Sequence, residues 1–187
     1  MNLDKFTIKS QEVVQKAQEI TQEFSHQQIE NEHLFKALME VDDNVLPFVF
    51  KKLQVNFSLL KKMTNSSLKS LPKISGGNLT LSTEASKTLI NAINISKAHK
   101  DEFVATHHLL TALFESDGGV SQMLKDQGIT KKNLKETLNQ LQKGEKITSE
   151  DIVFKRPGTG IAPSEVKDLL GSLVKDDIEP VSYTHLR

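Results

Sequence analysis

The chain has 187 residues, of which 37% are hydrophobic and 26% charged, which is typical of one well-packed domain with a small appendage. Its 24 basic and 24 acidic side chains cancel, so no net charge attracts nucleic acid or an anionic membrane. The absence of cysteine excludes disulfides, thiolate metal sites and a cysteine nucleophile.

No targeting or membrane-spanning pattern is visible in the sequence. The first residues, MNLDKFTIKSQEVV, lack the apolar run of a signal peptide. No apolar stretch of about 18 residues occurs anywhere in the chain. We therefore expect a cytoplasmic protein that binds neither nucleic acid nor membranes.

The first 140 or so residues contain an internal repeat. Residues 26–45 align with residues 101–120 at a constant offset of 75, and the same offset places residues 7–20 on residues 82–95. After the third helix the alignment slips by one residue. An apolar face that is matched over about 50 positions predicts a duplicated four-helix unit.

Capping residues locate the expected helices in chain order. Thr7 and Ser82 are suitable N-caps for the first helix of each repeat. Asn44 is expected to cap a third helix, with Pro47 in its first turn, where a missing N–H costs little. Thr130 is expected to cap the last helix, which runs through Leu134, Leu138 and Leu141. The apolar stripes of the two first helices are Val13, Ala17, Ile20 and Phe24 in one repeat and Ala85, Leu89, Ala92 and Ser96 in the other.

The predicted fold is an all-α domain over residues 1–148, followed by a short, poorly packed strand-turn-helix tail over 149–187. The two four-helix repeats span about 4–69 and 79–143, and the connector at 70–81 is rich in proline and glycine. Neither repeat has enough apolar face to fold confidently alone. We therefore expect the two repeats to pack against each other about a pseudo-twofold axis.

Five stretches within these repeats carry a family resemblance: FTIKSQEVVQKAQEI, IENEHLFKAL, LPKISGG, VATHHLLTAL and MLKDQGIT. They resemble the N-terminal domain (Clp N, or Clp R) of ClpB-type ATP-dependent chaperone disaggregases. The resemblance implies a module tethered ahead of hexameric ATPase modules. Such a module recruits unfolded or aggregated polypeptide through an apolar groove and nearby polar residues. It would be a binding module that needs no cofactor, and the less specific alternative is a helical interaction domain with an unrelated partner.

The sequence offers no clear catalytic constellation. The pattern G-x-x-x-x-G-K-[ST], which cradles nucleotide phosphates, is absent, so we expect no ATP hydrolysis by that mechanism. The paired carboxylates Asp42–Asp43 and Asp176–Asp177 are expected to be solvated loop or helix-end charges, because no pocket is evident that would separate their pKa values.

The histidines are predicted to be structural. His107 and His108 are adjacent, and adjacent helical side chains point about 100° apart, so these two are not expected to share a metal ion. His33 and His108 are repeat equivalents. We expect each to form a hydrogen bond to the turn at the start of its helix.

The resemblance also implies polar residues that contact the client polypeptide. In the family a threonine near the N-terminus and an Asp-x-x-x-x-x-Glu pattern are implicated, and Thr7 and Asp101 match them. His107 stands where the glutamate is expected, although Glu32 keeps it in the first repeat. The candidate client-binding residues are therefore Thr7, Asp101 and His107. The alternatives are an N-cap for Thr7 and a solvated turn for Asp101.

From about residue 143 the sequence changes character. Residues 152–154 are expected to form a strand, followed by a Pro-Gly turn and a short helix. The text KGEKITSEDIVFKRPGTGI, leading into DLLG, resembles the C-terminal antifreeze-like (SAF) domain of sialic acid synthases over about 143–180. That resemblance implies a sugar-substrate contact for Arg156. The alternative function is therefore a fragment of such a synthase, inactive alone because no β/α barrel is present.

The join between the two resemblances falls on the stretch KGEKITS, which both families share. The final residues VSYTHLR resemble translated sequencing-adapter read-through. Together these features favour an artefactual chimera over a genuine fusion. Amplification of this junction from source DNA as one uninterrupted frame would overturn that interpretation.

Overall fold

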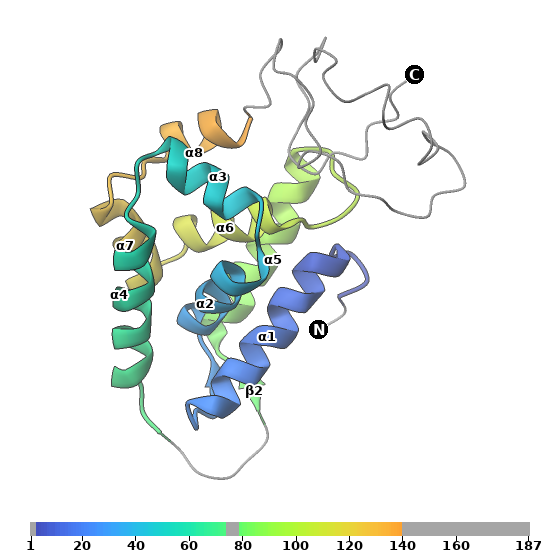
Figure 1. Ribbon diagram of the computed structural model, residues 1–187. Helices are drawn as coiled ribbons and strands as arrows, with labels where there is room; N and C mark the ends of the chain where they lie inside the picture. Colours follow the sequence, from blue (N-terminus) through green and yellow to red (C-terminus); the bar gives the residue numbers. More distant parts are fainter. Residues whose placement is uncertain (1–2, 74–78, 140–187) are drawn as a thin grey trace, which may run out of the picture. The chain divides into compact units, whose positions relative to one another are not determined.

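The computed structural model describes residues 3–73 and 79–139 of the chain (Figure 1). Residues 1–134 form one compact unit, and residues 135–187 form a second. The predicted tail, with its strand, turn and helix, lies outside the described residues. No helix among the residues described is long and apolar enough to span a membrane.

Each repeat folds into four helices, as the repeated apolar pattern predicts. The first repeat contains α1 (Ile8–Glu23), α2 (Asn31–Val41), α3 (Val45–Lys52) and α4 (Phe57–Ser70). The second contains α5 (Thr83–Ala98), α6 (Thr106–Glu115), α7 (Gly119–Asp126) and α8 (Lys131–Leu138). The turns after α3 and α7 place Gln54 at φ 54° and Gly128 at φ 81°. These equivalent left-handed positions are 74 residues apart, which agrees with the predicted slip after the third helix.

Three of the four predicted N-caps are confirmed. Thr7 Oγ1 accepts a hydrogen bond from Ser10 N at 3.2 Å, and Ser82 Oγ accepts one from Ala85 N at 3.1 Å. Thr130 Oγ1 accepts one from the Asn133 amide at 3.2 Å. Each bond satisfies a donor that the first turn of a helix leaves without an intrahelical partner. The predicted apolar stripes of α1 and α5 are buried, apart from the half-buried Phe24.

The predictions for Asn44 and Asp42 are wrong. The Asn44 side chain makes no capping bond. Instead Asp42 Oδ1 accepts from Asn44 N at 2.9 Å and from Val45 N at 2.7 Å, so a buried carboxylate caps α3. Its charge is favoured there because the helix N-terminus carries a partial positive charge. Asp43 is exposed as expected and forms an ion pair with Lys9.

A short parallel sheet joins the two repeats. Strand β1 (Gln28–Ile29) pairs with β2 (Thr80–Leu81), which occupies the end of the predicted connector. A second parallel bridge pairs Phe6 with Val104. Phe6 is equivalent to Leu81, and Val104 to Ile29, so each repeat gives the other the same pairing.

The backbone hydrogen bonds at these two pairings are also reciprocal. Thr7 N donates to Val104 O at 3.0 Å, and Ser82 N donates to Ile29 O at 3.1 Å. In each case the capping residue of one repeat's first helix is tied to the segment before the other repeat's second helix. This exchange supports the predicted pseudo-twofold arrangement.

The second helices of the repeats form the centre of the first unit. Helix α2 packs against α1, α4 and α6, and α6 packs against α5 and α7. Figure 1 shows α2 between α1 and α4. Their apolar side chains are nearly inaccessible, including Leu34, Phe35, Leu38, Leu110 and Leu113. The reciprocal contacts of α1 with α6 and of α2 with α5 extend this core across the repeats.

Candidate functional site

The structure brings two of the three predicted contact residues, Asp101 and His107, together and ties the backbone of Thr7 to the segment between them. The bond from Thr7 N to Val104 O sets the start of α1 against the segment between α5 and α6. Asp101 lies at one end of this segment and His107 in the first turn of α6. We call residues 5–7 with residues 101–108 the polar junction.

Thr7 serves as an N-cap, the alternative considered for it. Its side-chain oxygen accepts from Ser10 N and also donates to Ser10 Oγ at 3.0 Å. The residue is buried. Its hydroxyl is therefore engaged within α1, and contact with a client remains a prediction.

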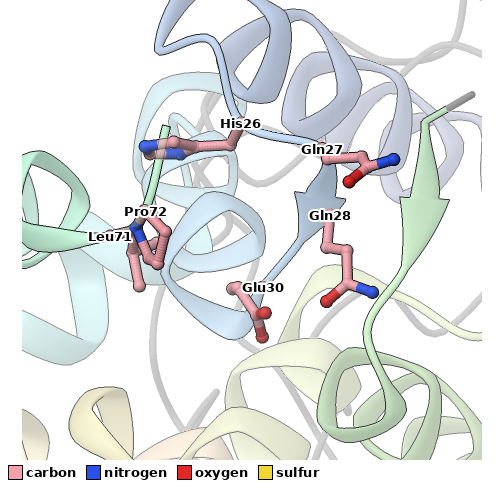
Figure 2. Close-up of a pocket in the computed structure, with 6 residues that line it drawn as sticks. All are labelled: His26, Gln27, Gln28, Glu30, Leu71 and Pro72. Atoms are coloured by element: carbon pink, nitrogen blue, oxygen red, sulfur yellow. The ribbon is translucent and has the colours of Figure 1, made fainter. Parts of the chain in front are cut away.

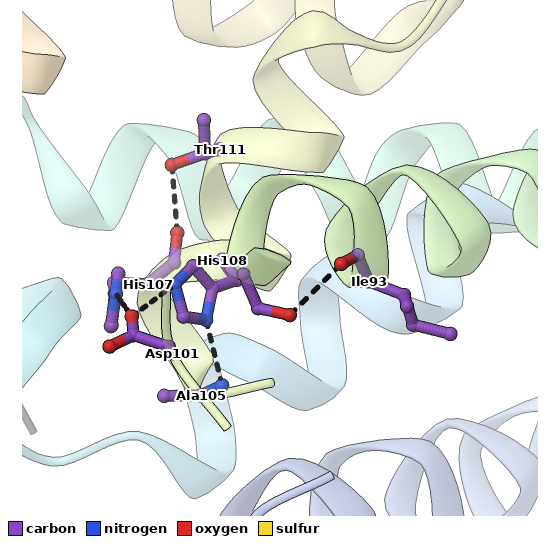
Figure 3. Close-up of polar contacts among 7 residues, drawn as sticks. Ile93, Asp101, Ala105, His107, His108 and Thr111 are labelled. Carbon is purple, nitrogen blue, oxygen red and sulfur yellow. Dashed lines mark hydrogen bonds and ion pairs between the residues drawn. The ribbon is translucent and has the colours of Figure 1, made fainter. Parts of the chain in front are cut away.

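Asp101 is not simply a solvated turn residue. Its Oδ2 lies 2.9 Å from His108 Nε2 and 3.9 Å from His107 Nε2, and its side chain is 26% exposed (Figure 3). His107 is only 5% exposed, which limits its direct contact with a large partner. A client role for Asp101 and His107 stays a prediction.

The expected divergence of His107 and His108 is wrong. Their ring centroids are 3.8 Å apart, and both rings face the same carboxylate. The cause is the position of His108 in the first turn of α6. Its ring folds back so that Nδ1 accepts from Ala105 N at 3.0 Å, which brings the ring beside His107.

The structural role predicted for His33 and His108 is confirmed. His33 Nδ1 accepts from Glu30 N at 2.9 Å, as His108 Nδ1 does from Ala105 N. Because Nδ1 is the acceptor in both rings, the proton of each neutral ring resides on Nε2. For His33 this nitrogen lies 2.8 Å from His26 Nδ1, which therefore accepts.

Burial keeps these histidines neutral at pH 7. Desolvation, aided by the neighbouring His26, lowers the pKa of His33 to about 4. Desolvation, with a contribution from His99, lowers the pKa of His107 to about 4. The pKa of His108 falls to about 3 through burial and the nearby imidazoles, although the adjacent Asp101 carboxylate favours the protonated form.

One group of side chains has the composition of a metal site. His99, Asp101, His107 and His108 each offer a ligand atom, and these atoms all lie within 4.8 Å of one another. Spacing alone did not predict this group, because two of its members are adjacent and His99 lies beyond the end of α5. The loop between α5 and α6 brings them together.

The sequence patterns also gave no indication of two exposed isoleucines. Ile8 on α1 is 68% exposed, and Ile90 on α5 is 54% exposed. Their repeat equivalents are Thr83 and Gln15, so neither position needs an apolar residue for folding. Comparison of the two repeats position by position would have identified both.

A small pocket of about 220 Å³ lies before the start of α2 (Figure 2). His26 Nε2 is buried there and has no hydrogen-bond partner among the described residues. Figure 2 shows that residues from the α1–α2 segment and from the end of α4 line it. The lining residues are His26, Gln27, Gln28, Glu30, Leu71 and Pro72.

Comparisons with known proteins agree with the fold. The solved Hsp104 N-terminal domain from Candida albicans superimposes with a TM-score of 0.66 and 22% identity, covering 74% of this chain and 91% of that one. The complex of a ClpV N-domain with a VipB peptide gives a TM-score of 0.60 at 14% identity, covering 75% and 91%. Both similarities concern the fold alone.

Sequence relatives are chaperones. The chain is 43% identical over 150 residues to the chaperone protein ClpB of Bacteroides thetaiotaomicron and 34% identical to that of Porphyromonas gingivalis. Each match covers 80% of this chain but only 17% of the relative's length.

Two domain families match different parts of the chain. Residues 137–180 match the SAF domain, and Arg156 within them lies outside the described residues. Residues 5–127 match the Clp repeat (R) N-terminal domain. With the two interlocked four-helix repeats, this match shows that the chain belongs to the family of Clp N-terminal domains.

Proposed function

We propose that residues 1–148 form a module that binds unfolded or aggregated polypeptide segments, without catalytic activity of its own. Membership of the Clp N-terminal domain family supports this proposal, as does the ClpV N-domain solved with a VipB peptide. In a full-length relative such a module would be tethered to hexameric ATPase modules. The observation that carries the proposal is the exposure of Ile8 and Ile90.

These isoleucines are explained better by binding than by folding. Ile8 directly follows Thr7, so it is adjacent in sequence to the polar junction. Ile90 lies on α5, which is equivalent to α1 in the second repeat. Because the equivalent positions carry Thr83 and Gln15, the repeat architecture tolerates polar residues at both sites.

The expected affinity is low. Full burial of an isoleucine contributes about 1.5–3 kcal/mol, so the two together contribute about 3–6 kcal/mol. Association and ordering of a flexible client cost roughly 4–15 kcal/mol. Further apolar contacts must therefore supply the rest of the binding free energy. Because the favourable and unfavourable terms nearly cancel, binding should be weak and promiscuous, which permits client release.

The test is a fluorescence titration of the chain with a permanently unfolded test protein. Ile8→Ser and Ile90→Ser should each weaken binding severalfold. Leu59→Ser is the matched control, because Leu59 is a 41% exposed apolar residue on α4. The absence of saturable binding at high micromolar concentration would contradict the proposal. Equal losses of affinity in all three variants would show that binding does not depend specifically on Ile8 and Ile90.

The SAF match favours a second candidate function for the end of the chain. For residues 149–187 we propose a fragment of the substrate-contacting domain of a sialic acid synthase, with Arg156 as the residue for the sugar. It should be inactive alone, because the sequence holds no β/α barrel for the reaction. An assay with phosphoenolpyruvate and an acylated amino sugar should give no turnover, and measurable turnover would contradict this assignment.

A further inference from the structure

We propose that His99, Asp101 and His107 form a binding site for a divalent transition-metal cation of the zinc type. The site lies just beyond the end of α5, against the first turn of α6. Imidazole nitrogens with one carboxylate oxygen are ligands that zinc commonly uses. The ligand atoms of these residues are already gathered within 4.8 Å.

Comparison of the two repeats distinguishes these three residues from His108, which has a structural role. Only His108 has an identical equivalent, His33, and both bond the turn before their helix. At the other three positions the first repeat has Phe24, His26 and Glu32 in place of His99, Asp101 and His107. Because the first repeat folds with these different side chains, the fold does not require the combination found in the second.

His108 itself is excluded as a ligand by its tautomer. Its Nδ1 accepts the hydrogen bond from Ala105 N, so the proton is on Nε2, the nitrogen that faces Asp101. This nitrogen cannot bind a cation while it carries a proton. It instead lies 2.9 Å from Asp101 Oδ2 and positions that carboxylate, as groups behind metal ligands do.

The second observation that points to a ligand is the environment of His107. Its ring is 5% exposed, and its Nδ1 is buried without a hydrogen-bond partner among the described residues. Its Nε2 is 3.9 Å from Asp101 Oδ2, which is beyond hydrogen-bond distance. Because Nδ1 has no hydrogen-bond partner among the described residues, no such bond fixes the ring proton on Nε2. With the proton on Nδ1, the lone pair of Nε2 is available to a cation between the ring and the Asp101 carboxylate.

The distances fit a cation after a small closure. Two ligand atoms at about 2.0–2.1 Å from zinc with a tetrahedral angle are about 3.4 Å apart. The separation of His107 Nε2 and Asp101 Oδ2 is therefore about 0.5 Å too long. His99 is exposed and lies at the rim, so a cation can enter there and keep water in its remaining position.

Cobalt titration of the full 187-residue chain without a histidine tag tests the site. We expect one Co²⁺ per chain with the visible absorption of a low-symmetry site, displaced by one equivalent of Zn²⁺. His99→Ala and His107→Ala should each lower the Co²⁺ affinity by about 100-fold, at the upper end of the effects seen for residues around metal sites. His26→Ala is the matched control and should leave the affinity unchanged, because His26 is the first-repeat equivalent of Asp101.

His107→Ala and His26→Ala each remove a buried ring, so circular dichroism must first show that both variants fold. His99→Ala changes an exposed residue, retains the fold and decides the question by itself. Unchanged affinity in His99→Ala, or no Co²⁺ binding by the wild-type chain, would overturn the proposal. Equal losses in His26→Ala and His99→Ala would do the same, because they would place the cation elsewhere.

Discussion

Asp101 Oδ2 lies 2.9 Å from His108 Nε2, and the equivalent pair in the first repeat, His26 and His33, is separated by 2.8 Å. A carboxylate and an imidazole thus occupy equivalent positions and have the same structural role. Each lies beside the Nε2–H of a histidine that caps the start of a second helix. The requirement conserved between the repeats is an acceptor and not a particular residue.

This relationship predicts how substitutions at Asp101 affect stability. Asp101→Ala should destabilise the domain by about 1–3 kcal/mol, because it removes the carboxylate oxygen that lies 2.9 Å from the buried Nε2 of His108. Asp101→Asn keeps an acceptor oxygen and should cost less. Urea denaturation measures both, and equal losses in the two variants would show that the acceptor is not the cause.

The pKa of His33 predicts a loss of stability in acid. Its folded pKa of about 4 is below its ordinary value of 6.5, so the unfolded chain binds the extra proton first. The contribution of His33 to the free energy of unfolding is complete above pH 6.5 and is lost as the pH falls from 6.5 toward 4. At about 1.4 kcal/mol per pH unit, this amounts to about 3 kcal/mol.

His33→Asn provides the measurement for this pH effect. Its side-chain oxygen can still accept from Glu30 N, but it does not titrate. The free energy of unfolding of the variant should fall about 3 kcal/mol less than that of the wild type between pH 7 and pH 4. Parallel stability curves for the two proteins would contradict the assignment.

The cap of α3 offers a contrast between two neighbouring residues. Asp42→Ala removes both bonds to the helix start and should destabilise the domain by about 0.5–2 kcal/mol. Asn44→Ala should change stability by less than about 0.5 kcal/mol, because its side chain makes no capping bond. Thermal or urea unfolding of the two variants checks the difference, which reverses if Asn44 is the functional cap.

The first repeat is not expected to fold alone. Residues 1–75 lack the partners of β1 and of Phe6, which are β2 and Val104 in the other repeat. They also lose the packing of α2 against α6. Circular dichroism and analytical ultracentrifugation of this fragment should show no stable, cooperatively folded monomer. A sharp unfolding transition would mean that the repeats are independent domains.

Much of the local structure could be predicted because its causes are local. The caps at Thr7, Ser82 and Thr130 depend on side chains that bond amides three residues away. Asn44 shows the limit of such reasoning. Its residue type suits a cap, but the Asp42 carboxylate two positions earlier folds forward onto the first amides and is favoured by its charge.

By itself, the sequence determined the duplicated four-helix unit, the slip after the third helix and the matching roles of His33 and His108. These follow from periodicity and capping, which depend on neighbours along the chain. Only the tertiary structure decided that His99, Asp101 and His107 converge and that Ile8 and Ile90 remain uncovered. Convergence depends on how a loop folds back on a helix start, and exposure depends on which surfaces the other repeat covers. Neither is encoded in the spacing of residues along one helix.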